Sequence, residues 1–278
     1  MPNHVSNILR IVGDDADVKN VLESIEGIDE DNKPVAIDFN KIIPMPETLK
    51  IESGSTTDMC IEIFLTALNQ RVAVFGLSDS GRQEYADMIK NLNSRKIIKP
   101  YNGFLTEAEV KEKVESILKF ERKDLTCLDD IYRLGMTALD NVRKYGGKDW
   151  YDWSVESWGT KWNAYCIEAE DNIITFDTAW SAPIPIFMEL VLKFPNVDFE
   201  IEWADEDMGS NTGCYSSENG EISGGYHEDC SVEAYNTYVR CNGESDCLEQ
   251  DSDGDWSRKS CEECGVCYDD ETLALPSA

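Results

Sequence analysis

The sequence predicts an α+β protein: an N-terminal module of strands and helices, then an antiparallel α/β sandwich, then an acidic tail rich in cysteine. Three observations lead to this prediction. Strand-like alternation and helical apolar spacing recur over the first 205 residues. A Gly-Gly pair at 146–147 interrupts these patterns. After residue 205, Gly, Ser, Asn and acidic residues dominate. We expect an N-terminal module over residues 1–147, a sandwich over 148–225 and the tail over 226–278.

The first module opens with a strand over residues 5–12, followed by a helix whose apolar side chains recur at helical spacing. A second strand is expected from Pro34 to Phe39, and a loop over 40–57. Four helices are then predicted, over residues 58–69, 80–94, 106–121 and 124–145. Thr106 and Glu109 form a capping box at the start of the third, because each side chain can bond the free amide of the other residue.

The second module is predicted to contain a helix at 154–162, strands at 164–169 and 172–178, a helix at 184–194 and a strand at 197–203. This α-β-β-α-β order is close to the ferredoxin-like sandwich, in which helices cover one face of an antiparallel sheet. Further strand-like pieces occur near Ile222 and over 235–240. We expect the chain to be mobile from about residue 242, because few large apolar side chains follow.

Several segments resemble the Api92-like family of proteins from phages and plasmids. They are Met1 to Val5, Ile37 to Pro46, Trp158 to Asn163 (Trp-Gly-Thr-Lys-Trp-Asn) and Phe176 to Pro183 (Phe-Asp-Thr-Ala-Trp-Ser-Ala-Pro). The resemblance covers roughly residues 1–50 and 148–225. It implies a ferredoxin-like domain of β-α-β-β-α-β topology and a mobile-element setting, without an iron–sulfur cluster and without established catalytic residues. The tail beyond about residue 230 departs from the family pattern.

The charge is strongly negative, with 55 acidic against 25 basic side chains and a formal net charge of −30. Direct binding of nucleic acid is not expected, because such binding depends on cations that contact phosphate and no basic patch is visible. The predicted partner is a host or defence protein with a basic surface, and the acidic surface would imitate the charge of DNA. Asp205, Glu206 and Asp207 are the candidate contact residues. The competing interpretation is that the charge only keeps the protein in solution.

The sequence reaches Asp14 without an apolar run and contains no segment of membrane-spanning length, so we expect a bacterial cytoplasmic protein and no membrane partner. In that reducing compartment, cysteines are thiols or metal ligands. The candidate zinc ligands are Cys261, Cys264 and Cys267 together with Cys230, Cys241 or Cys247. Free thiols in a mobile tail are the alternative. An iron–sulfur cluster is not expected, because the run lacks its fourth cysteine near Glu271.

Two other patterns are weaker. Asp251, Asp253 and Asp255 suggest calcium, but neither register of a calcium-binding loop places both its glycine and its final glutamate correctly. The histidines, His4 and His227, have no nucleophile in a recognisable context, which disfavours a hydrolase.

Six tryptophans crowd into the second module. Packing of Trp158, Trp162 and Trp180 in its core is preferred over an exposed platform for bases, because only Lys161 lies near them in sequence. Two functions remain open. One is a non-enzymatic acidic binding protein, such as an anti-defence inhibitor or DNA mimic; the other is a zinc-containing accessory protein or enzyme of nucleic-acid metabolism.

Overall fold

The computed structural model describes residues 3–29, 31–69, 105–120 and 124–260. The chain divides into two compact units: Met1–Pro44 with Ser157–Ala278, and Met45–Glu156. We refer to them as the sheet unit and the helical unit. The helix predicted over 80–94 lies outside the described residues. No described helix is long and apolar enough to cross a membrane.

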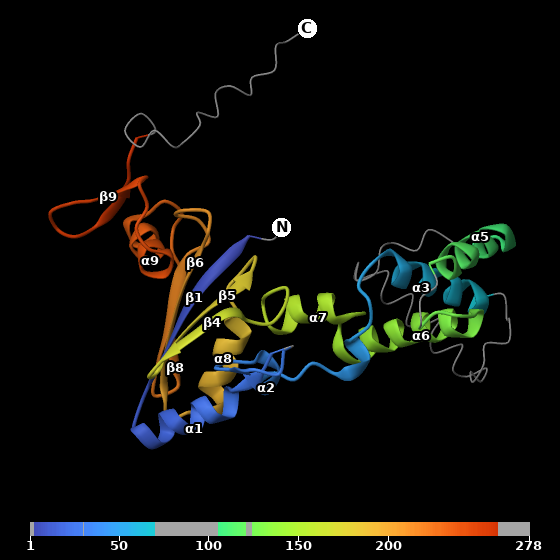
Figure 1. Cartoon of the computed structure of the whole chain (residues 1–278), viewed down its shortest axis with the longest axis horizontal. Coiled ribbons are helices and arrows are strands. Elements are labelled where there is room, and N and C mark those ends of the chain that lie inside the picture. The colour runs from blue at the N-terminus through green and yellow to red at the C-terminus, as the bar shows by residue number, and fades with distance from the viewer. Residues whose placement is uncertain (1–2, 30, 70–104, 121–123, 261–278) are drawn as a thin grey trace, which may run out of the picture. The chain divides into compact units, whose positions relative to one another are not determined.

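The sheet unit is built on a six-stranded antiparallel sheet in the order β4-β5-β1-β6-β7-β8 (Figure 1). The strands are β1 (His4–Val12), β4 (Tyr165–Glu170), β5 (Ile173–Ala179), β6 (Asp198–Asp205), β7 (Gly213–Glu218) and β8 (Glu221–Tyr226). Helix α1 (Asp15–Ile25) follows β1, and α8 (Ile184–Lys193) joins β5 to β6. The β1-α1-β4-β5-α8-β6 order and the central place of β1 give the ferredoxin-like topology, to which β7 and β8 add a hairpin.

The first strand therefore belongs to the second predicted module. Val5, Leu9 and Ile11 are buried and lie opposite Asp205, Ile201 and Phe199 of β6. The structure divides the chain after residues 44 and 156, whereas the sequence pattern placed boundaries after residues 147 and 225. The physical reason is that a strand's pattern predicts which of its faces is buried but not which distant strand it pairs with.

The two faces of this sheet differ. Alternate residues of each strand point to the same face. Helices α1, α2 (Phe39–Ile42) and α8 lie on the face that carries Leu9, Ile201 and Trp203, and α9 (Val232–Asn242) lies across β6 on the other side (Figure 1). We call the side with α9 the open face. Helix α9 contacts only part of it, at β6 and β1, and the side chains of β4 on this side are exposed.

Two of the predicted strands are wrong or too long, because capped helices begin within or before them. Strand β3 covers only Pro34–Val35, where it pairs with β2 (Gly27–Ile28), and the Asp38 side chain then accepts a hydrogen bond from the amide of Asn40 and begins α2. Residues 235–240, expected as a strand, lie in α9, because Ser231 caps that helix through the amide of Ala234. Beyond it, β9 (Leu248–Gln250) pairs with β10 (Trp256–Arg258), so this part of the expected mobile tail is a hairpin.

The helical unit contains the short turn η1 (Glu47–Leu49), α3 (Ser55–Asn69), α5 (Glu107–Leu118), α6 (Leu128–Tyr145) and α7 (Trp150–Ser157). The capping box at Thr106 and Glu109 is confirmed. Helix α6 ends at Gly146, whose φ of 84° is left-handed. Helices α3 and α6 pack closely: a Cβ atom at Gly135 would lie 2.4 Å from the carbonyl oxygen of Cys60.

Candidate functional site

Two tryptophans and a lysine form a partly exposed group at one end of the sheet. The Nζ atom of Lys161 lies 4.6 Å from the ring centroid of Trp162 and 4.6 Å from that of Trp180. We call these three residues the Trp–Lys cluster. An ammonium over an indole face is attracted by the negative charge of the π system, so each contact is a cation–π interaction.

Hydrogen bonds join the two sequence motifs that supply this cluster. The Thr160 hydroxyl donates to the carbonyl of Ala179 at 2.9 Å and accepts from its amide at 3.1 Å. The hydroxyl of Ser181 donates to the carbonyl of Gly159. Gly159 has a φ of 79°, and a Cβ there would lie 2.6 Å from Cδ of Pro185. The Gly-Thr-Lys and Ala-Trp-Ser segments therefore hold each other in place.

Trp180 is exposed in a strained backbone conformation. Its φ is 74° and its side chain is 41% exposed. A bulky residue in the left-handed region is rare, and such strain costs about 1–3 kcal/mol. The amide of Trp180 donates to the carbonyl of Asn3 at 2.9 Å, and its carbonyl accepts from Nδ2 of Asn211 at 3.0 Å. These two bonds hold the residue where the ring meets solvent.

Asp205 fixes both of those asparagines. Its carboxylate accepts hydrogen bonds from Nδ2 of Asn3 at 3.2 Å, from Nδ2 of Asn211 at 2.9 Å and from the amide of Asp207 at 2.9 Å. Asp205 is buried, whereas Glu206 and Asp207 are exposed. Of the three residues predicted to contact a partner, Asp205 is thus placed to organise the loop behind Trp180.

The predicted burial of three tryptophans holds only in part. Trp158 is 3% exposed, donates from Nε1 to the carbonyl of Ile43 at 2.9 Å and packs edge-on against Phe39. Trp162 is partly buried. The prediction is wrong for Trp180, which follows β5 directly in a left-handed backbone conformation and is 41% exposed.

Tyr165 and His4 extend the Trp–Lys cluster onto the open face. The Tyr165 ring centroid lies 6.4 Å from that of Trp162, and its hydroxyl lies 2.7 Å from Nδ1 of His4. Burial and the nearby charge of Asp177 raise the pKa of Tyr165 to about 12, so it remains protonated near neutral pH. This arrangement suits recognition, because the hydroxyl stays a neutral hydrogen-bonding group.

Carboxylates dominate the rest of the open face. They belong to Glu168, Glu170, Asp177, Asp198, Glu200, Glu202, Glu218 and Glu221, which share this face by strand register. Arg10 is the only Lys or Arg among the described strand residues of the face. Glu202 pairs with Arg10 and with Arg240 of α9. Burial alone would raise the pKa of Glu202, but hydrogen bonds from the two arginines outweigh it, and the pKa lies below its usual value.

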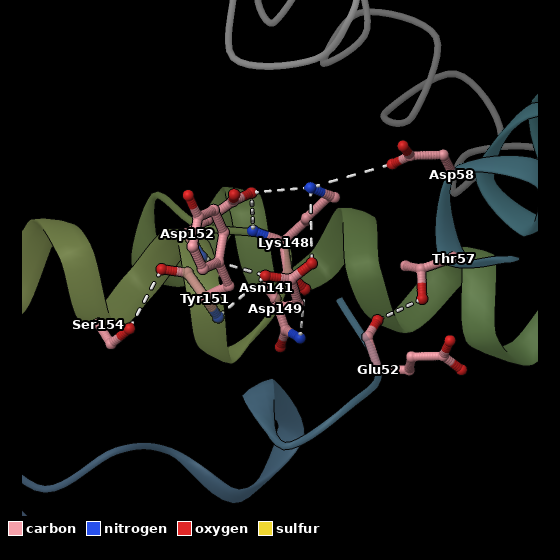
Figure 2. A network of polar contacts seen from close by, with 9 residues as sticks. All are labelled: Glu52, Thr57, Asp58, Asn141, Lys148, Asp149, Tyr151, Asp152 and Ser154. Atoms are coloured by element: carbon pink, nitrogen blue, oxygen red, sulfur yellow. Dashed lines mark hydrogen bonds and ion pairs between the residues drawn. The ribbon is translucent and has the colours of Figure 1, made fainter. Parts of the chain in front are cut away.

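A second polar cluster lies in the helical unit, around Lys148 (Figure 2). The Nζ atom of Lys148 lies 3.2 Å from Asp152, 3.5 Å from Asp149 and 3.9 Å from Asp58. Burial alone would lower the pKa of Lys148, but the three carboxylates together raise it above its ordinary value. The lysine is therefore protonated, and it is not a nucleophile near neutral pH.

The residues around Lys148 have structural tasks. Oδ1 of Asp149 accepts from the amides of Tyr151 and Asp152 and so caps α7 (Figure 2). Nδ2 of Asn141 donates to the carbonyls of Thr48 and Lys148. The cluster thus joins the start of α7 to α3 and α6. We assign this cluster to the stability of the helical unit.

The structure does not bring the described cysteines together. Cys230 is exposed, Cys241 is partly buried on α9 and Cys247 is buried. Burial raises the pKa of Cys241 to about 12. Within the described residues no group of three potential ligands could hold a metal ion. Cys261, Cys264 and Cys267 lie outside the described residues, so zinc stays a prediction. Asp251, proposed for calcium, accepts from the amides of Asp253 and Asp255 in the β9–β10 turn.

Residues 157–245 match the family model described as the ferredoxin-like domain in Api92-like protein. This part of the chain is an Api92-like domain. The resemblance predicted from the two tryptophan motifs is confirmed, because both motifs fall inside the match. The crystal structure of a protein api92 from Yersinia pseudotuberculosis is similar at 13% sequence identity and a TM-score of 0.38, over 82% of this chain and 99% of that one. No curated protein matches the chain.

Proposed function

We propose that the chain is a non-enzymatic binding protein whose partner is a protein with a basic surface. The observation that carries this proposal is the open face of the Api92-like domain, where exposed carboxylates outnumber cations and Arg10 is already paired with Glu202. A surface of one sign attracts partners of the opposite sign and increases their rate of association.

The same observation argues against RNA as the ligand of this face. RNA-recognition modules with a comparable four-stranded sheet stack bases on aromatic side chains of that sheet. Here the open face of the sheet carries Asp177, Glu168 and Glu202, whose charges repel phosphate. A protein that itself binds DNA has the required basic surface. The proposed partner class is therefore a DNA-binding protein of a host or of its defence systems, and the open face would then compete with DNA.

The test compares two variants that each remove two exposed negative charges. Glu168→Gln/Glu170→Gln alters the open face on β4, and Glu107→Gln/Glu112→Gln alters α5 of the helical unit. Partners are captured from a bacterial lysate, purified, and measured for association and dissociation rates over a range of salt concentrations. We expect the open-face variant to slow association by roughly 2- to 10-fold and the α5 variant to leave it unchanged.

Two further results are required of the partner. Its binding must weaken as salt rises, because exposed charges are screened within about 8–10 Å at physiological ionic strength. Duplex DNA must compete for it. A partner that is neutral or acidic and binds independently of salt would contradict the proposal.

A further inference from the structure

The Trp–Lys cluster is a site that already contains a cation. The ammonium of Lys161 lies at 4.6 Å from both the Trp162 and Trp180 centroids, which is within the distance at which an indole face attracts positive charge. The structure thus shows which chemical group the two rings accommodate together, namely an alkylammonium.

Groups other than the lysine side chain hold the backbone of Trp180. Its backbone is fixed by Asn3 and Asn211, and both asparagines are fixed by buried Asp205. The Thr160 bonds to Ala179 hold the neighbouring strand end. The Trp162 ring packs edge-on against Tyr165. Because these contacts do not involve the Lys161 side chain, the backbone of Trp180 and the ring of Trp162 should keep their positions when that side chain moves away.

The surrounding charges favour a cation. Asp177 lies opposite Tyr165 in the strand register, and both Asp177 and Glu206 act on the Tyr165 hydroxyl strongly enough to help raise its pKa. Glu206 is also attached to β1 through its amide, which donates to the carbonyl of His4 at 2.8 Å. A positively charged ligand that reaches the rings therefore enters a negative environment.

We propose that Trp162 and Trp180 form a binding site for an alkylammonium or guanidinium group of a basic partner, and that Lys161 occupies this site until the partner displaces it. The proposal deepens the proposed function, since it rests on a partner that is basic. Lys161 is then an intramolecular competitor. A group attached next to its site acts at a high effective concentration, so its removal should strengthen binding of an external cation.

The site can be tested without the partner by using choline and its neutral isostere 3,3-dimethyl-1-butanol. Binding is followed through the indole N–H signals of the two tryptophans by NMR and through tryptophan fluorescence. The proteins are the full chain, Lys161→Ala, Lys161→Gln, and Lys111→Ala as a matched control on the exposed surface of α5. Two cation–π contacts predict that Lys161→Ala binds choline about 5- to 30-fold more tightly than the neutral isostere.

The same variant should bind choline more tightly than the unaltered chain and than Lys111→Ala. Adding Trp180→Leu to Lys161→Ala should abolish the preference for choline, because leucine keeps apolar bulk but has no π face. The near-UV circular dichroism of each protein verifies that the fold is retained. Lys161→Gln keeps a long side chain and removes only the charge, so it separates the effect of charge from that of side-chain size.

The inference is overturned if Lys161→Ala and Lys161→Gln bind choline and its isostere with equal affinity. It is also overturned if the two variants bind choline no more tightly than the unaltered chain does. It is also overturned if the choline preference survives Trp180→Leu. These outcomes leave the proposed function intact, because the open-face charges are tested separately with Glu168→Gln/Glu170→Gln. Conversely, a salt-independent partner would remove the proposed function while a choline preference would still support the cation site.

Discussion

Replacing Lys148 by Met should destabilise the helical unit through a buried charge that loses its partner. The Asp149 side chain has no exposed surface, and its Oδ2 atom has no hydrogen-bond partner among the described residues. Lys148 is the cation that compensates it, at 3.5 Å. Methionine preserves most of the apolar chain of lysine, so the substitution removes the charge with little change in packing.

The magnitude follows from the burial of the pair. Removal of one partner from a buried ion pair costs about 3–5 kcal/mol. Because the Lys148 side chain keeps 18% of its exposure, water reaches part of the pair, and we expect about 3 kcal/mol, the lower end of that range. This is a large share of the roughly 5–15 kcal/mol that stabilises a typical domain.

The assay must separate the two units, because their unfolding need not coincide. Hydrogen exchange of peptides from α6 and α7 at increasing urea reports the free energy of opening of the helical unit alone. Lys144→Met, on the exposed end of α6, is the matched control and should cost less than about 1 kcal/mol.

A double variant tests the mechanism. Asp149→Asn keeps an oxygen that can cap α7 but removes the charge, so Lys148→Met/Asp149→Asn should be more stable than Lys148→Met alone by at least about 1 kcal/mol. The reasoning would be refuted if Lys148→Met cost no more than Lys144→Met, or if the second substitution gave no recovery.

Three other predictions concern single groups. The pKa of Lys148 is raised in the folded state, so its stabilising contribution is complete below the unfolded pKa of about 10.4 and is lost as pH rises through the folded pKa. The urea midpoint of the helical unit should therefore decrease when the pH exceeds about 10.5. The decrease should be smaller in Lys148→Met. Trp158→Ala should cost about 3–5 kcal/mol, whereas Trp180→Ala should cost less, about 2 kcal/mol, because Trp180 is 41% exposed; thermal or urea unfolding of the sheet unit distinguishes them. The pKa of Cys241, raised to about 12, leaves almost no thiolate at pH 8, so iodoacetamide should modify this cysteine far more slowly in the folded chain than in urea; equal rates would contradict its burial.

Local patterns in the sequence predicted local structure well. The capping box at Thr106 begins α5, and the left-handed Gly146 ends α6. Each of these depends on atoms a few residues apart. The predicted strand at 235–240 failed for a local reason as well, because the Ser231 cap begins a helix that runs through these residues.

Long-range pairing could not be predicted in the same way. Nothing within residues 4–12 specifies that β1 lies between β5 and β6, strands that follow about 160 or more residues later. The ferredoxin-like order was consequently recognised without its first strand. The role of Asp205 was missed for the same reason: in sequence it begins a run of three acids, while in space it bonds Asn3, which is 202 positions away.

Trp180 illustrates why exposure itself requires an explanation. Tryptophan is usually well buried, and burial was the better expectation from sequence. In the structure this residue has a φ of 74°, a conformation that glycine would adopt without strain, and its ring remains 41% exposed. Its 41% exposure forgoes part of the hydrophobic stabilisation that full burial of a tryptophan gives, and the backbone strain of about 1–3 kcal/mol offsets much of the rest. Stability alone therefore does not explain an indole at this position. Presentation of the ring to a ligand does, and the ammonium of Lys161 held 4.6 Å from its centroid indicates that the ligand is a cation.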